Sequence, residues 1–124
     1  MANDFKSFSK QNVAIDSGTY STLYTVPYTA SPVESILLEI DVANTHASND
    51  ITVDVKVNKN SGGTGGTDDI FIVKAAPVPV GGALKVVSGQ KIVLMSTATG
   101  ADTVTVAASA ASSADCIVSL LEDV

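Results

Sequence analysis

Residues 51–58, ITVDVKVN, alternate strictly between apolar and polar side chains. Ile51, Val53, Val55 and Val57 occupy the odd positions, and polar or charged residues occupy the even ones. Because successive side chains of a β-strand point to opposite faces, the pattern predicts a strand with one face on a core and the other in water.

The same period of two recurs at residues 34–44, ESILLEIDVAN, where it places Ile36, Leu38, Ile40 and Val42 on one face. Between the two segments lies the short polar stretch THASND, which suits a hairpin loop. We therefore expect residues 34–58 to form an antiparallel pair of strands.

Further strand-like segments follow one another to the end of the chain. Residues 69–75 are apolar on both faces, as expected of a central strand or of one that a neighbouring subunit covers. We expect residues 83–87 and 91–96 to pair around a tight turn at 88–90. The other strand-like segments are TLYTV at 22–26, TVTVAAS at 103–109 and DCIVSLLE at 115–122.

About eight short strands with turn signals every 8 to 12 residues predict an all-β fold. We expect a single-domain, antiparallel β-sandwich of the jelly-roll type over residues 13–124. Residues 1–12 are polar and predict an N-terminal arm, on which Phe5 and Phe8 could act as two anchors. Pro77 and Pro79 predict that APVPVGG is an edge or a connection.

Composition excludes several classes of function. The net charge of −6 and the absence of arginine argue against nucleic-acid binding, because no basic surface is available to neutralise phosphates. We find no apolar run as long as a membrane span and no apolar core of a signal peptide. We therefore expect a protein that is made in a cytoplasm and does not enter a membrane.

The residues offer little for catalysis. Cys116 is the only cysteine and lies in an apolar run, so we expect a buried and inert thiol. His46 is the only histidine and lies in a polar loop, which makes a pair of nucleophile and base improbable. Asp41 and Asp54 would face water on neighbouring strands. We expect no enzyme and no cofactor.

The glycine-rich stretch NSGGTGGTDD at residues 60–69 has three interpretations. A phosphate-binding loop would need a lysine where this chain has two aspartates. A calcium site of the repeat type would need tandem copies, and this chain has one. We expect a flexible connection between two strands, without a metal.

Charged and aromatic side chains suggest surface contacts. Glu39 and Lys56 could form a cross-strand pair. Tyr20, Tyr24 and Tyr28 recur every four residues, which would place them on one face of a strand if Pro27 did not interrupt it. The tyrosines could form a sugar-stacking platform, cover the edge of the sandwich or contact another protein.

Several phrases of the sequence together resemble a group of small β-rich virion proteins of tailed bacteriophages, notably those of marine bacteria and cyanobacteria. They are LYTVP, DVANTHASNDITVDVKVN, IFIVKAAPVPVGGALKV, GQKIVLMS and ASSADCIVSLLEDV, which span about residues 20 to 122. This chain carries YTASPVES where the group has a short Ala-Gly turn, so that loop could suit a different neighbour.

The resemblance implies a structural accessory protein of the virion. It would bind the capsid as a decoration or cement protein, with the phage major capsid protein or neck and tail proteins as partners. We expect a homo-oligomer, such as a trimer. The alternatives are a neck, tail or receptor-binding component with a sugar-binding face, or a carbohydrate-binding module. The side chains expected at partner contacts are Phe5, Phe8, Tyr20, Tyr24, Tyr28, Phe71, Pro77 and Pro79.

Overall fold

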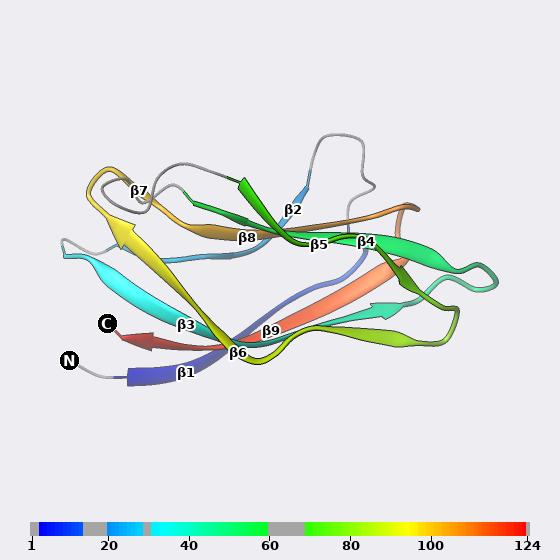
Figure 1. The fold of residues 1–124 in the computed structure, drawn as a ribbon, viewed down its shortest axis with the longest axis horizontal. Helices are drawn as coiled ribbons and strands as arrows, with labels where there is room; N and C mark the ends of the chain where they lie inside the picture. Colours follow the sequence, from blue (N-terminus) through cyan, green and yellow to red (C-terminus); the bar gives the residue numbers. More distant parts are fainter. Residues whose placement is uncertain (1–2, 14–19, 29–30, 60–68, 124) are drawn as a thin grey trace.

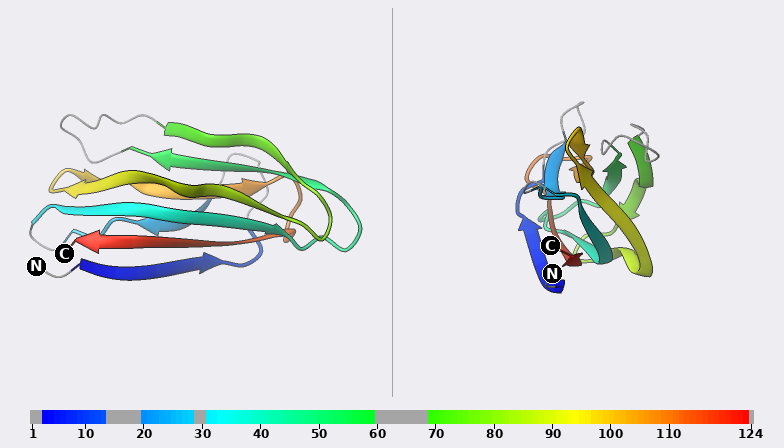
Figure 2. Two further views of the ribbon diagram at one scale, coloured as in Figure 1. Left: turned by 60° about the horizontal axis from the view of Figure 1, so that its bottom comes forward. Right: turned by 90° about the vertical axis from the view of Figure 1, so that its left-hand side faces the viewer.

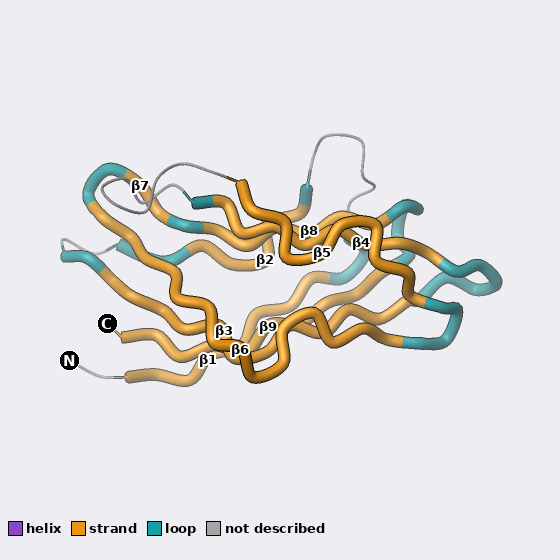
Figure 3. The backbone as a smooth tube through the Cα atoms, in the orientation of Figure 1, coloured by secondary structure: helices purple, strands orange, loops and turns teal. Residues whose placement is uncertain are grey.

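The computed structural model of the chain describes residues 3–13, 20–28, 31–59 and 69–123. Within these ranges the backbone forms strands and no helix (Figure 1, Figure 3), so none of the described residues belongs to a membrane-spanning helix. The strands are β1 (Asn3–Lys10), β2 (Ser21–Thr25), β3 (Val33–Asn44), β4 (Ile51–Asn58), β5 (Asp69–Val78), β6 (Ala83–Thr97), β7 (Gly100–Ala101), β8 (Thr103–Ala108) and β9 (Ala114–Asp123).

The strands form two antiparallel sheets that pack face to face (Figure 2). One sheet has five strands in the order β1-β9-β3-β6-β7, and the other has four in the order β2-β8-β4-β5. Apart from the short β7, only β4 and β5 follow each other within the same sheet. This alternation between the two sheets is the jelly-roll arrangement, with β7 as a short addition to the five-stranded sheet. The expected all-β sandwich is confirmed.

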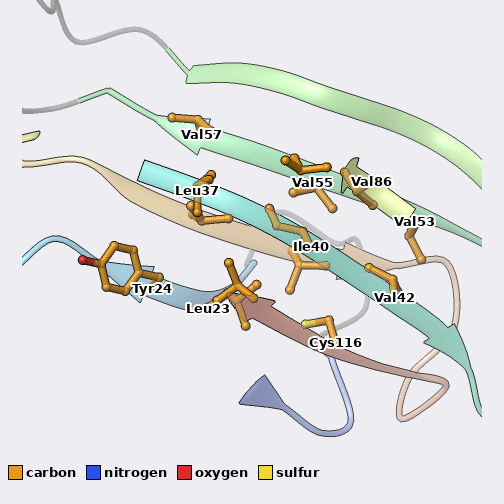
Figure 4. Packing of buried hydrophobic residues seen from close by; sticks show 14 of the residues in the cluster. Leu23, Tyr24, Leu37, Ile40, Val42, Val53, Val55, Val57, Val86 and Cys116 are labelled. Atoms are coloured by element: carbon orange, nitrogen blue, oxygen red, sulfur yellow. The ribbon is translucent and has the colours of Figure 1, made fainter. Parts of the chain in front are cut away.

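The core lies between the two sheets and consists mainly of valine, leucine and isoleucine (Figure 4). The alternation at residues 51–58 works as predicted, because Ile51, Val53, Val55 and Val57 are all buried. β-Branched side chains suit this position, since they pack well on a pleated surface and lose little rotamer freedom there.

The predicted hairpin over residues 34–58 is wrong, because β3 and β4 lie in different sheets. β3 pairs with β6 and β9, whereas β4 pairs with β5 and β8. The connection between them crosses from one layer to the other, which lets both strands bury their apolar faces against each other. The Asn44 side chain fixes the start of this crossing, because its Nδ2 donates to the carbonyls of Asn49 and Val78, both at 3.0 Å.

The predicted turn at residues 88–90 is also absent. β6 runs without a break through this segment, and both of its halves pair with β3. The register shifts where Leu37 pairs with Ile92 and Glu39 pairs with Ser88, so the ladder has a bulge there. Lys91 has a positive φ of 56° at this irregularity. A bulge accommodates extra residues by bending a strand, and the sequence signal for a turn was this bulge.

The bulge also changes which side chains of β3 face the core. Leu37 is fully buried, whereas Ile36 and Leu38 are only half-buried. Beyond the bulge, Ile40 and Val42 are buried as predicted. The extra residue reverses the in-and-out order between the two halves of the strand, so the prediction was right for one half and wrong for the other.

Residues 3–10, which we expected in an arm outside the sandwich, instead form β1 of the five-stranded sheet. β1 pairs with β9 along all its residues, from Asn3 opposite Asp123 to Lys10 opposite Cys116. The pairing satisfies backbone groups of β9 that would otherwise form an open sheet edge. β1 thereby becomes the edge strand (Figure 2).

Candidate interaction surfaces

The three tyrosines do not share a face. Tyr24 is only 3% exposed and packs in the core, Tyr20 is half-buried, and Tyr28 is exposed. A register shift between Thr22 and Tyr24 places Leu23 and Tyr24 both inside, so the spacing by four does not return to the same side. The sugar-stacking platform therefore does not form in this arrangement.

Tyr24 instead anchors a buried polar cluster between the sheets. Its hydroxyl donates to Glu122 Oε2 at 2.6 Å and lies 2.7 Å from Ser35 Oγ. Lys6 of β1 reaches the same carboxylate, with Nζ 2.9 Å from Glu122 Oε1. The ring of Phe8 lies against Tyr24 with centroids 5.1 Å apart. The cluster fastens the edge strand to the core.

Burial and charge shift the pKa values of this cluster. The hydrogen bond and the opposite charge of Glu122 raise the pKa of Lys6. Burial, followed by the hydrogen bond to Glu122, raises the pKa of Tyr24. Both shifts preserve the protonated forms, which are the forms that donate to the carboxylate. The cluster therefore supports the structure by holding Lys6 and Tyr24 on the buried carboxylate.

The outer face of the four-stranded sheet is built around Asp54. This side chain is buried, contrary to the expectation that it faces water, and it lies in a different sheet from Asp41. Tyr20 donates its hydroxyl to Asp54 Oδ2 at 2.7 Å, and the Ala75 amide donates to Oδ1 at 2.6 Å. Ala75 has a positive φ of 51°, so Asp54 satisfies a backbone amide at an irregular point of β5.

Lys56 covers the aromatic rings of this face. Its Nζ lies 4.1 Å from the ring centroid of Tyr20 and 5.5 Å from that of Phe71. Lys74 lies 4.4 Å from the Phe71 centroid. The expected pair of Glu39 and Lys56 is absent, because the two strands belong to different sheets. Lys56 Nζ instead lies 3.6 Å from Asp69 Oδ2, and Lys85 Nζ lies 3.7 Å from Glu39 Oε1.

Side-chain hydrogen bonds complete the same face. Thr105 and Thr103 donate their hydroxyls to Asn58 Oδ1 at 2.8 and 3.3 Å. These contacts satisfy polar groups within the chain. The outer face of the four-stranded sheet is thus largely polar and internally bonded, although Phe71 beside the two lysines is 39% exposed.

The outer face of the five-stranded sheet is different, because an apolar row crosses it. The pairing registers align Phe5 of β1 with Leu121 of β9, Leu121 with Ile36 of β3, and Ile36 with Val93 of β6. Phe5 is 79% exposed and Val93 is 50% exposed, while the two central members are half-buried. We call Phe5, Leu121, Ile36 and Val93 the outer apolar row.

Two shallow hollows flank this row on the same sheet. One, of about 350 Å³, is lined by Phe5, Leu38 and Ser119 among others. The second, of about 220 Å³, lies toward the other end of the strands and includes Ile117, which is 45% exposed. The outer face of the five-stranded sheet therefore has exposed apolar side chains with shallow hollows beside them.

Sequence reasoning found only one member of the outer apolar row, Phe5. The alternation places Ile36 on the same face as Ile40 and Val42, which are buried, because it does not account for the bulge at Leu38. The signal was present in the run of three apolar residues at 36–38, which breaks the alternation. Val93 and Leu121 join the row only through the register of the sheet, and no local pattern gives that register.

Apart from Phe5, the expected contact residues do not belong to the row. Phe71 and Pro77 are exposed on β5, the edge of the four-stranded sheet, as the prolines predicted. Pro79 begins the turn into β6, where its carbonyl accepts from the Gly82 amide at 2.9 Å. Phe5 and Phe8 belong to β1 at the edge of the other sheet. With Tyr24 in the core and Pro79 in a turn, the predicted set is scattered and does not form one surface.

The described residues contain no group of three or more histidine, cysteine, aspartate or glutamate side chains arranged to hold a metal. Cys116 is buried as expected, and burial raises the pKa of its thiol to about 11. His46 uses Nδ1 to accept from the amides of Ser48 and Asn49, at 3.1 and 3.0 Å. Residues 60–68 of the glycine-rich stretch lie outside the described residues.

No protein-family model matches this chain, and no curated protein matches it. Solved structures show similarity of fold. A chain of infectious bursal disease virus, Gx strain, has a TM-score of 0.51 at 12% identity, and the match covers 98% of this chain and 31% of the viral chain. The chain therefore spans less than a third of that viral protein's length.

Two further structures match at lower TM-scores. A pilus protein of Bacillus endospore appendages has a TM-score of 0.42 at 16% identity, covering 98% of this chain and 85% of that one. The CBM22-1 xylan-binding domain of Paenibacillus barcinonensis Xyn10C has a TM-score of 0.34 at 14% identity, covering 95% and 83%. At these identities the likeness concerns the fold alone.

Proposed function

We propose that this chain is a non-enzymatic structural protein of a virion, which binds the capsid of a tailed bacteriophage and stabilises it as a decoration or cement protein. The observation that carries the proposal is the outer apolar row on the five-stranded sheet. The sequence resemblance to small phage virion proteins supports the same assignment. The jelly roll is compatible with it, since viral capsid and lectin domains use this architecture, although a fold alone does not determine a function.

The outer apolar row is suited to protein contact. Contiguous exposed apolar surface is uncommon on monomers and marks sites that a partner covers. Small-molecule sites are concave and enclose most of their ligand, whereas Phe5 and Val93 stand on an open sheet face with shallow hollows beside them. A broad protein surface fits this face better than a small ligand does.

A capsid offers such a surface in many equivalent copies. An oligomer of this chain would engage several copies at once, so that each contact can be modest while the whole assembly binds tightly. The net charge of −6 favours solubility of a free pool in the host cytoplasm before assembly. In this proposal the partner is the major capsid protein, and the protein is located in the virion after assembly.

The first experiment counts copies of the chain per particle by quantitative mass spectrometry of purified virions. We expect hundreds of copies, as for a protein that decorates the capsid surface. A dozen copies or fewer would move the protein to the neck or tail. Absence from purified particles would refute the virion role.

The second experiment tests the face. Particles that lack this protein are mixed with the wild-type chain or with Phe5→Asp/Val93→Asp, and bound protein is measured by sedimentation. We expect the double variant to lose most of its binding, because two carboxylates would have to be desolvated at the contact. Thr22→Asp on the four-stranded sheet is the matched control and should bind as the wild type does. Equal binding by all three would refute the assignment of this face.

A further inference from the structure

The edge strand β1 has the features of a strand that pairs with another strand. It is the outermost strand of the five-stranded sheet, and no other described strand lies beyond it (Figure 2). An antiparallel edge strand directs part of its backbone N–H and C=O groups away from its only neighbour, and such a row is a template for a further strand. Its residues from Asp4 to Lys10 are all exposed.

The other edges of the sandwich are interrupted or short, and β1 is not. β6, which β7 covers only at Ser96 and Thr97, has a bulge with the positive φ of Lys91. β5 contains Pro77, the positive φ of Ala75 and two shifts of register with β4. β2 has only five residues and a shift of its own. β1 pairs with β9 over eight residues without a shift and contains no proline. Proteins usually protect edges with bulges, prolines or short strands, and this chain protects β5 and β2 in these ways but leaves β1 regular.

We propose that β1 pairs antiparallel with β1 of a second copy of this chain, about a two-fold axis at Ser7. The sequence of the strand decides this register. Residues directly opposite each other in an antiparallel pair lie on the same face of the sheet. A symmetric pair can therefore be centred only on a residue, not between two residues. The candidate centres are Phe5, Lys6, Ser7 and Phe8.

Charge favours the centre at Ser7. In that register Asp4 of each copy lies opposite Lys10 of the other, which gives two pairs of opposite charge. Both side chains lie on the inner face of the sheet. In the register of β1 with β9, Asp4 is opposite Glu122 and Lys10 is opposite Cys116, and both of these β9 residues are buried. Cross-strand pairs of opposite charge stabilise a sheet, and like charges directly opposite destabilise it.

The other centres are worse. A centre at Lys6 places Lys6 opposite its own copy, and a centre at Phe8 places Lys6 opposite Lys10. A centre at Phe5 also gives two pairs of opposite charge, Asp4 with Lys6, but it would compete with the contact of Lys6 with Glu122 and leaves Lys10 beyond the end of the pairing. The centre at Ser7 allows residues 4–10 to pair throughout and leaves Lys6 opposite Phe8, so that Lys6 can keep its contact with Glu122 inside its own chain.

Such a pair would join the two five-stranded sheets into one continuous sheet. The contact is isologous, because the same strand serves both copies, and it closes as a dimer. The outer apolar row would then occur twice on one continuous face. The inference rests on β1 alone and does not depend on the virion role.

The test is a charge exchange read by analytical ultracentrifugation. We expect the wild-type chain to sediment as a dimer at about 100 μM. Asp4→Lys and Lys10→Asp should each be shifted to monomer, because each places like charges opposite each other twice. An equimolar mixture of the two variants should restore dimers, since every opposed pair at these positions then has opposite charge. Glu34→Lys, a charge reversal on the outer face away from the edge, should remain dimeric.

Cysteine cross-linking tests the register independently. Ser7 and Ser9 are both exposed on the same strand. Ser7 would lie opposite its own copy at the 4.5–5.5 Å between Cα atoms of opposed residues, which a disulfide can bridge, whereas Ser9 would lie opposite Phe5. Under mild oxidation Ser7→Cys should form a covalent dimer at least ten-fold faster than Ser9→Cys. A monomeric wild type, a dimer insensitive to both charge variants, or equal cross-linking at both positions would overturn the proposal.

Discussion

The two outer faces of the sandwich differ in how their side chains are bonded and exposed. On the four-stranded sheet, polar groups bond to one another, with Tyr20 on Asp54, Lys56 over aromatic rings and Thr105 on Asn58. On the five-stranded sheet, Phe5 and Val93 stand exposed with nothing described above them. The polar groups of the first face are bonded largely within the chain, although Phe71 is 39% exposed there. The apolar row of the second face would gain free energy if a partner removed it from water. The contrast shows that two faces of one sandwich can differ in how much apolar surface they leave exposed to water.

The largest difference in stability is expected when one aspartate is replaced on each sheet. Asp54→Ala removes the acceptor of Tyr20 and of the Ala75 amide inside the protein. We expect a loss of about 2–4 kcal/mol in the free energy of unfolding, because buried donors lose their partner. Asp41→Ala removes an exposed contact with Lys85 at 3.4 Å and should cost less than about 0.5 kcal/mol. Urea denaturation measures the free energy of unfolding of both variants. Equal losses would contradict the different roles given to Asp54 and Asp41.

The second test uses alkaline pH and concerns the inner side of the five-stranded sheet. Burial raises the pKa of the Cys116 thiol from 9.0 to about 11. Above pH 9 the unfolded chain releases this proton and the folded chain keeps it, so stability is full below pH 9 and falls as pH rises to 11. The shift corresponds to about 2–3 kcal/mol. Cys116→Ala should remove this part of the decline in stability. Tyr24 is present in the wild type and in the variant, so its contribution to the decline is the same in both. An unchanged slope in the variant would contradict burial of the thiol.

The third test compares the irregular points of the two sheets. Ala75 on β5 and Lys91 on β6 have φ values of 51° and 56°, and both side chains are exposed. Glycine adopts this conformation without strain. Ala75→Gly and Lys91→Gly should therefore each raise the free energy of unfolding slightly, by about 0.5 kcal/mol or less after the entropy of the unfolded chain is counted. The melting temperature should rise accordingly. A decrease would show that Ala75 and Lys91 do not have the positive φ values described.

The smallest effect on stability is expected from the outer apolar row itself. Phe5→Thr/Val93→Thr keeps residues that suit strands while it removes apolar surface. We expect the free energy of unfolding to stay within about 0.5 kcal/mol of the wild type, as for exposed positions in general. Retention on a hydrophobic-interaction column should nevertheless fall. A large loss of stability would mean that the row is part of the core and not a docking surface.

Much of the fold could be predicted from local pattern. The strict alternation at residues 51–58 identified a half-buried strand because sheet geometry has a period of two. The prolines at 77 and 79 identified an edge because proline lacks the donor that a central strand needs. Both inferences depend on a few neighbouring residues, and the structure agrees with them.

The partners of each strand could not be predicted in the same way. Residues 34–44 and 51–58 are adjacent in sequence and lie in opposite sheets, and β3 instead pairs with β9 near the other end of the chain. The bulge at Leu38 has a weak local signal and reverses the face of Ile36. The candidate surface depends on both facts, because the row exists only when register brings four distant strands together.

The order of the strands in the five-stranded sheet also bears on how the protein is made. β9 lies between β1 and β3, although both are synthesised long before it. The ribosome must therefore release about a hundred residues before that layer can close, and contacts so distant in sequence form slowly. Until then β1 and β3 have no neighbour between them, so nascent chains are most vulnerable to mispairing during this interval.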